Sequence, residues 1–278
     1  MSSDAADRSS PVIRLRRAIR DSPAGRGWRR SGDVELGPRA LGFAALGFLA
    51  LVPLLIVVSA TAPERGRGFA TWLGDGLGVS IAAREHIRQL FSRPGQVLQT
   101  TTAFGLAALA VFGLSFAAVM QTGYEKVWEL ASARWYARWR QVLWLAVLIG
   151  FLYLSATTTL WRHSEVGTLA AMLSTVLFFW WSQRILLGGR IAWHALLPGA
   201  VATALGLLGL RVFSRLVFSP LIASSVVTYG PFGTVLVIQS WLVGVGVVVF
   251  GGALAGRVLH EELPRLAHAV RQRTQRRT

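Results

Sequence analysis

The sequence predicts an all-α membrane protein, a bundle of six transmembrane helices. Hydrophobic residues make up 53% of the 278 positions, charged residues only 15%, and there are eleven tryptophans. This composition is typical of a polytopic membrane protein rather than a soluble domain. The clearest single stretch is 231–256, which contains no acidic or basic residue. Because about 20 apolar residues in a helix cross the bilayer core, this stretch is predicted to span it.

Five further apolar stretches precede it, and together they predict a membrane domain over 40–256. A basic cytoplasmic segment, 1–39, comes before this domain, and a basic tail, 257–278, follows it and is expected to be solvated. The first span contains Pro53, which removes a backbone hydrogen bond and predicts a bend. The predicted spans are 41–62, 97–120, 142–160, 168–187, 195–213 and 233–255.

The connections between the spans differ in character. Residues 63–96 are too polar to cross the bilayer, and both an interfacial and a re-entrant arrangement remain open. Residues 121–140 interleave tryptophans with arginines, a pattern that can stack bases. Beside a membrane the same pattern more often marks a belt at the lipid headgroups, which is the interpretation we favour. Residues 214–232 are predicted to form an outer loop.

Small residues follow one side of the last predicted span. In lipid, small side chains allow helices to approach closely, so they mark a packing face. We therefore expect this helix to lie inside the bundle, although glycine is also common in membrane helices in general. The stripe consists of Gly233, Ser240, Gly244 and Gly251, with Gly252 and Gly256 beside it.

The positions of the basic residues predict the orientation. With the N-terminus inside, cytoplasmic segments hold twenty-one of the 29 Lys and Arg residues and outer loops hold eight. Positive residues favour the cytoplasmic side, so both termini are predicted to be cytoplasmic. The net charge of +16 then follows from topology, and nucleic acid need not be a partner.

The residues do not indicate an enzyme. The chain has no cysteine, and its five histidines, which a metal site would need in a cluster, are scattered over loops and the tail. No HExxH, GxSxG or P-loop motif is present. We therefore predict no catalytic, cofactor-binding or metal-binding residues and no cofactor. The histidines are His86, His163, His194, His260 and His268.

Neutral polar residues within the spans indicate another function class. The central turns of the predicted spans hold no Asp, Glu or Lys, which argues against an ion-coupled carrier that uses buried carboxylates. A path for an amphiphile needs no ionisable residue within the spans, because the tail can stay in the bilayer while the headgroup follows a lining of neutral polar side chains. The alternative is that these side chains only join helices, at about 0.6 kcal/mol each. The candidate polar path consists of Thr157, Thr158, Ser174, Thr175, Gln183, Thr203, Gln239 and Ser240, and the candidate headgroup contacts are Arg184, Arg190, Arg211 and Arg215.

Several motifs resemble the YihY/BrkB-type inner-membrane proteins, once labelled ribonuclease BN. They are ALGFAALGFLALVPLL in the first span, FGLSFAAVMQTGYEKVWEL after the second, WHALLPGA at 193–200 and YGPFGTV at 229–235. The last helix departs from the family's Gly-Ala-Glu-Leu-Asn ending, because this chain has Gly-Gly-Ala-Leu-Ala at 251–255. Any role of that acid and amide is therefore not carried over. The family-like structural positions are Pro53, Pro198, Gly199, Tyr229, Gly230 and Gly233.

The resemblance implies a multi-pass protein of a bacterial cytoplasmic (inner) membrane without an agreed biochemical activity. At family level there are links to envelope lipid export and to resistance to host serum, and the ribonuclease label looks like a misassignment. We therefore expect a transporter or flippase-like handler of an anionic lipid or envelope precursor, with anionic headgroups as partner. The alternative is a scaffold that recruits a partner or anionic lipid through its basic segments, and a tRNA-processing ribonuclease is the least expected. The sequence indicates no particular protein partner, and it is compatible with a homo-oligomer.

Overall fold

The computed structural model describes residues 32, 34–61, 98–132, 138–157, 165–229 and 231–275. Within these residues the chain forms six α-helices and no strand, so the predicted all-α class is confirmed. The loop 63–96, Thr158, Gly230 and most of the N-terminal segment 1–39 lie outside the described residues. The helices are α3 (Leu36–Thr61), α6 (Leu98–Val127), α7 (Arg138–Thr157), α8 (Glu165–Leu186), α9 (Trp193–Tyr229) and α10 (Pro231–Gln275).

Four of these helices are long and apolar enough to cross a membrane. Their apolar stretches are Gly105–Val127 in α6, Gly167–Leu186 in α8, Trp193–Ser214 in α9 and Val235–Glu262 in α10. Helix α3 contributes a shorter apolar stretch, Leu36–Leu51. These findings support a membrane protein, and the crossing by all six helices stays a prediction.

The predicted loop over 214–232 differs from the structure, and the last helix is longer than its apolar run. Helix α9 continues to Tyr229 and α10 begins at Pro231, so the predicted loop over 214–232 is helical on both sides of residue 230. Helix α10 also continues through the predicted tail to Gln275. Hydropathy falls where charges begin, but backbone hydrogen bonds do not depend on hydropathy, so helices extend past the apolar run.

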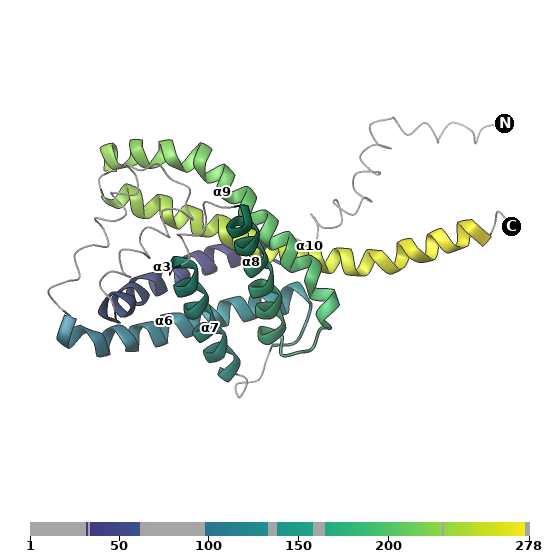
Figure 1. Cartoon of the computed structure of the whole chain (residues 1–278), viewed down its shortest axis with the longest axis horizontal. Helices are drawn as coiled ribbons and strands as arrows, with labels where there is room; N and C mark the ends of the chain where they lie inside the picture. Colours follow the sequence, from purple (N-terminus) through teal and green to yellow (C-terminus); the bar gives the residue numbers. More distant parts are fainter. Residues whose placement is uncertain are drawn as a thin grey trace, which may run out of the picture.

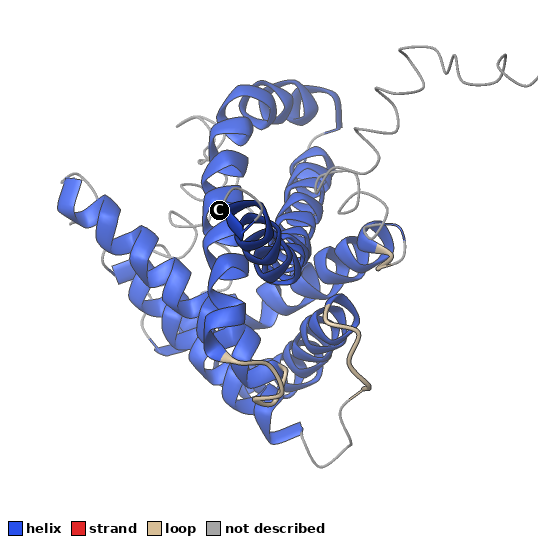
Figure 2. Ribbon diagram, turned by 90° about the vertical axis from the view of Figure 1, so that its right-hand side faces the viewer, coloured by secondary structure: helices blue, strands red, loops and turns tan. Residues whose placement is uncertain are grey.

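Helix α10 is the centre of the arrangement. At 45 residues it is about 67 Å long at ~1.5 Å per residue. Its last part leaves the other helices, as the yellow ribbon in Figure 1 and the view from its C-terminal end in Figure 2 show. It packs most extensively on α9, then on α3, and also on α6. These contacts agree in part with the expectation that this helix lies inside the bundle, because one side of it, with Leu236, Ser240 and Val247, is exposed.

The α9–α10 contact is antiparallel and depends on small residues. A Cβ on Gly256 would lie 2.5 Å from the Cα of Gly199, and one on Gly252 would lie 2.8 Å from the backbone nitrogen of Thr203. The predicted pair Gly252 and Gly256 therefore makes the close approach. In the stripe beside this pair, a Cβ on Gly244 would meet the side chain of Leu210 at 3.1 Å, but a Cβ on Gly251 would meet nothing within 4 Å. The stripe is therefore a packing face only in part.

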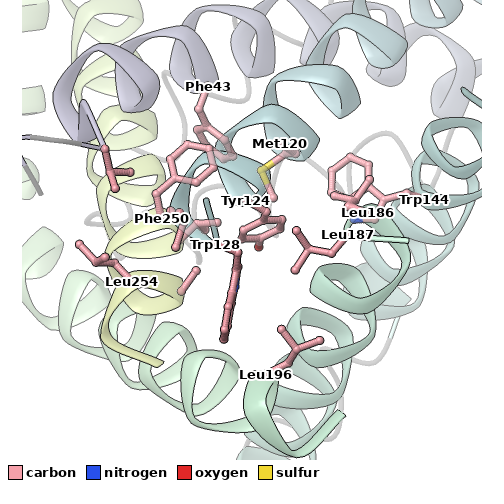
Figure 3. Close-up of a cluster of buried hydrophobic side chains, with 14 of the residues drawn as sticks. Phe43, Met120, Tyr124, Trp128, Trp144, Leu186, Leu187, Leu196, Phe250 and Leu254 are labelled. Atoms are coloured by element: carbon pink, nitrogen blue, oxygen red, sulfur yellow. The ribbon is translucent and has the colours of Figure 1, made fainter. Parts of the chain in front are cut away.

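Large aromatic side chains fill the core between the helices, as Figure 3 shows. The ring of Phe250 in α10 meets Phe43 of α3 with centroids 6.1 Å apart and Tyr124 of α6 with centroids 6.0 Å apart, both edge-on. Trp144 of α7 is also buried there. Each such pair adds about 0.5–1.5 kcal/mol beyond its buried area. This aromatic layer separates the two regions described next.

Candidate functional site

A cavity of about 340 Å³ lies among the helices and is lined by side chains from all six of them. Nearly all of the lining consists of leucine, phenylalanine and other apolar side chains. Its size is within the range of ligand pockets, about 300–1,000 Å³. Polar atoms reach its lining mainly from Ser155, Thr175, Arg211 and the indole of Trp241. We call this space the central cavity.

At one end of the bundle, beyond the aromatic layer, a second region is rich in charge. We define it as the charged junction, and it joins the end of α6, the α8–α9 turn and α10. Its members are Gln121, Glu125, Glu129, Gln141, Arg190, Arg257 and Glu261.

Glu125 is the buried acid of the charged junction, with a side chain only 3% exposed. Arg190 Nη2 donates to Glu125 Oε1 at 2.6 Å, and Gln121 Nε2 donates to the same oxygen at 3.1 Å. Gln141 Nε2 of α7 donates to Gln121 Oε1 at 2.9 Å. Buried charges need such partners, because desolvation otherwise disfavours them strongly. The network therefore ties α6, α7 and the α8–α9 turn together.

Arg257 connects α10 to the same place. Its Nη1 donates to the backbone oxygen of Val127 at 2.7 Å, and its Nη2 lies 2.9 Å from Glu129 Oε2. Its Nε donates to Glu261 Oε1, one turn further along α10, at 2.8 Å. Arg257 is 9% exposed. The prediction of a solvated tail is therefore wrong at its start, because Arg257 and Val258 are buried next to the end of α6.

Helices α6 and α8 end in the same hydrogen-bond pattern at this region. Leu130 N donates to Glu125 O at 2.8 Å, and Gly189 N donates to Arg184 O at 3.1 Å, each a Schellman bond. The left-handed residue is Gly188 in α8, with φ 67°, but Glu129 in α6, with φ 51°. A left-handed conformation costs a residue with a Cβ about 1–2 kcal/mol, so Glu129 is held there against its preference.

Tryptophans and an arginine lie next to the α8–α9 turn. Trp180 Nε1 donates to the backbone oxygen of Trp193 at 2.8 Å, and the Arg184 guanidinium lies 5.4 Å from the centre of the Trp193 ring. Arg184 also donates to the backbone oxygens of Gly189 and Ile191. Arg184 thus closes the end of its own helix, and the exposed ring of Trp193 fits a membrane interface.

The predicted polar path does not converge on one space. Among the members whose side chains the structure describes, Thr175 alone lines the central cavity. Gln183 and Thr203 are buried near α10, where Thr203 Oγ1 donates to Gly199 O at 2.8 Å. The exposed hydroxyls of Ser174 and Ser240 donate to carbonyls of their own helices. Gln239 is half-buried, Thr157 ends α7, and Thr158 lies outside the described residues.

The predicted headgroup arginines have separate locations. Arg211 lines the central cavity, whereas Arg190 belongs to the charged junction and Arg184 to the α8–α9 turn. Arg215 lies in α9. Of the three whose side chains the structure describes, Arg211 is therefore the one placed beside a space that a ligand could enter.

The family-like positions serve packing where the structure describes them. Pro53 is buried within α3, Gly199 contacts α10 together with its neighbour Pro198, and Gly233 is buried near the start of α10. Tyr229 is the last residue of α9.

Sequence reasoning missed Glu125 and Arg257. Both were assigned to polar segments outside the spans because the apolar runs end at Met120 and Gly256. One signal was present, since Gln121 and Glu125 are four residues apart and share a helix face. Their partners lie 65 and 130 residues away, which no local pattern can show.

A comparison with protein-family models decides the relationship. The model described as virulence factor BrkB matches residues 28–276. The chain belongs to the BrkB family. No curated protein and no solved structure matches it. The resemblance to YihY/BrkB proteins is therefore confirmed over most of the chain, and BrkB membership agrees with the four long apolar helices in indicating an integral membrane protein.

Proposed function

We propose that this BrkB-family protein handles an anionic lipid in the bacterial inner membrane, either moving it between leaflets or positioning it for transfer. The observation that carries the proposal is the central cavity, which all six helices line with apolar side chains and into which Arg211 contributes a cation. We also propose that this activity is not enzymatic and that both termini are cytoplasmic, with the charged junction on that side.

The physical argument concerns the two ends of a lipid. The lining of the cavity is as apolar as the bilayer core, so an acyl chain exchanges one apolar environment for another at small cost. Most of the free-energy cost of moving the lipid comes from its headgroup, because an unpaired charge in a low-dielectric medium is strongly disfavoured. A guanidinium beside the cavity lowers that cost through charge-assisted hydrogen bonds to an anionic group.

Reconstituted vesicles test the proposal. Vesicles that contain the protein and a fluorescent phosphatidylglycerol should lose the inner-leaflet signal to a membrane-impermeant quencher faster than empty vesicles, because lipid that moves outward becomes accessible to the quencher. Ala50 of α3 lines the cavity, so Ala50→Phe should slow this movement towards the empty-vesicle rate by filling the space. Ala146→Phe on the exposed side of α7 is the matched control and should leave it unchanged. Equal rates with and without the wild-type protein would remove lipid movement as the function.

The alternative is a scaffold, and the continuation of α10 to Gln275 favours it as second candidate. Arginines in this extension offer a cationic helix to an anionic lipid surface or a partner. Truncation after Pro264 retains Arg257 and its bonds but removes most of the extension. Loss of the cellular phenotype on truncation, with lipid movement in vesicles unchanged, would favour the scaffold. RNA cleavage that persists through stringent purification would instead restore the ribonuclease, which we regard as the least supported.

A further inference from the structure

The polar groups of the central cavity are not spread evenly along it. On α7, the lining residue Ser155 comes eleven positions after Trp144, about 16 Å further along the helix. On α10, Trp241 comes eight positions before Val249, which places it about 12 Å further from Arg257 and the charged junction. Ser155 is displaced from Trp144 towards the same end of the bundle. Trp144 and Val249 belong to the end next to the aromatic layer and charged junction. The cavity therefore has an apolar end near the junction and a polar end away from it.

Arg211 and Trp241 lie at this polar end on neighbouring helices. A Cβ on Gly244 of α10 would touch the side chain of Leu210 of α9 at 3.1 Å, which places Arg211 within about one turn of Trp241 across the antiparallel pair. Both residues line the cavity. Ser155 of α7 adds a hydroxyl to the same end.

The indole of Trp241 indicates what the polar end is suited to hold. Its Nε1 is buried, and it finds no hydrogen-bond acceptor among the residues that the structure describes. Buried donors without an acceptor are rare, because losing the bond to water is costly. Indole N–H and guanidinium groups donate only, so an incoming group must supply acceptor oxygens, and beside Arg211 a negative charge is favoured.

We infer that the central cavity binds one acyl chain of an anionic phospholipid, with the phosphate at Arg211 and Trp241 and the chain directed towards Trp144. The choice of an anionic lipid rests on the proposed function. The single chain follows from the size, since about 340 Å³ is at the low end of the range for ligand pockets. The second chain stays in the bilayer.

The same register places the headgroup in one leaflet. Trp241 precedes Arg257 of the charged junction by sixteen positions in α10, about 24 Å along the axis. The hydrocarbon core is about 30 Å thick. The phosphate therefore lies near the interface opposite the charged junction, and the bound lipid belongs to that leaflet.

Photo-crosslinking with two phosphatidylglycerol probes tests this orientation on the full-length protein in nanodiscs. One probe carries a diazirine at the end of its acyl chain and the other carries it next to the glycerol. We expect the chain-end probe to label peptides that contain Met120 and Trp144, and the glycerol-end probe to label peptides that contain Arg211 and Trp241. The reverse distribution would overturn the inference, as would labelling confined to exposed residues such as Leu169 and Leu173 of α8.

Substitutions at the polar end measure separately how much Arg211 and Trp241 contribute to lipid binding. Arg211→Gln removes a charged donor and should lower glycerol-end labelling about ten- to a hundredfold, whereas Arg211→Lys should retain most of it. Trp241→Phe removes only the indole N–H and should lower labelling about two- to tenfold. Folding of each variant is checked by circular dichroism and thermal unfolding. Unchanged labelling in Arg211→Gln would overturn the assignment of the phosphate.

Two further outcomes distinguish this inference from the proposed function. The labelling requires no transport, so the expected pattern together with equal vesicle rates would remove lipid movement while the site stands. Protein-dependent movement without labelling of the cavity peptides would remove the site and leave the function. Competition by a free fatty acid of equal chain length, without competition by unlabelled phosphatidylglycerol, would overturn the choice of a phospholipid.

Discussion

The central cavity and the charged junction are built by the same helices but differ in polarity and packing. The cavity keeps the helices apart around an apolar space, with Arg211 at its polar end. The junction draws α6, the α8–α9 turn and α10 together through paired charges and backbone oxygens, with Glu125 and Arg257 buried. The arginines of this protein therefore have different roles. Arg190 and Arg257 pair with acidic side chains of the charged junction, and Arg211 lines the central cavity.

The largest effect is expected from breaking the buried pair of the junction. Arg190→Met removes this cation from the buried carboxylate of Glu125, and because Arg190 is itself 32% exposed, we expect the lower end of the about 3–5 kcal/mol that breaking a buried pair costs. The measurement is thermal unfolding in detergent. The double variant Arg190→Met with Glu125→Gln should regain much of this loss, because the uncompensated charge is gone. Equal losses in the single and the double variant would show that the pair does not hold the junction.

A smaller effect is expected at the α9–α10 contact, which connects the two regions. Gly256→Ala would place a Cβ 2.5 Å from the Cα of Gly199, and such overpacking costs about 1–3 kcal/mol. Gly251→Ala is the matched control, because its Cβ meets nothing within 4 Å, and alanine in place of glycine favours a helix by up to about 1 kcal/mol. Unfolding of the two variants under the same conditions compares them. A Gly256→Ala variant as stable as Gly251→Ala would mean that the two helices can separate at no cost.

The smallest effect is expected at the exposed rim of the junction. Glu129→Gln loses the ion pair with Arg257 but keeps the left-handed conformation, and because this carboxylate is 70% exposed the loss should be about 0–1 kcal/mol. Glu129→Gly loses the same pair but removes the backbone strain, which is worth about 1–2 kcal/mol. We therefore expect Glu129→Gly to unfold at a higher temperature than Glu129→Gln. The opposite order would show that the carboxylate contributes more than its exposure indicates.

The sequence predicted the helices and their order well, because each contains an apolar run long enough to be recognised on its own. It also predicted the close contact at Gly252 and Gly256, since small residues spaced four apart share a helix face. The helix ends were predicted less well. Residues 121–127 and 257–262 carry charges but are helical, and two of these charges, Glu125 and Arg257, are buried against partners that only the folded chain supplies.

The candidate site shows the same limit. Hydroxyl positions could be listed from the sequence, but not whether a hydroxyl faces another helix or bonds to its own carbonyl, as those of Ser174 and Ser240 do. Arg211 was among the predicted headgroup contacts and does line the cavity. Trp241 was not, because the inference about it depends on a buried indole N–H without an acceptor among the described residues, which becomes visible only when the neighbouring helices are in place.

The length of α10 has a practical consequence for attaching probes. The apolar stretch of this helix ends at Glu262, and thirteen further residues continue it to Gln275, about 20 Å along the axis. A fluorescent domain fused to the C-terminus would therefore be held away from the membrane surface and clear of Arg257. Because the chain has no cysteine, a single one placed on α10 beyond Glu262 could report on membrane distance without any background labelling.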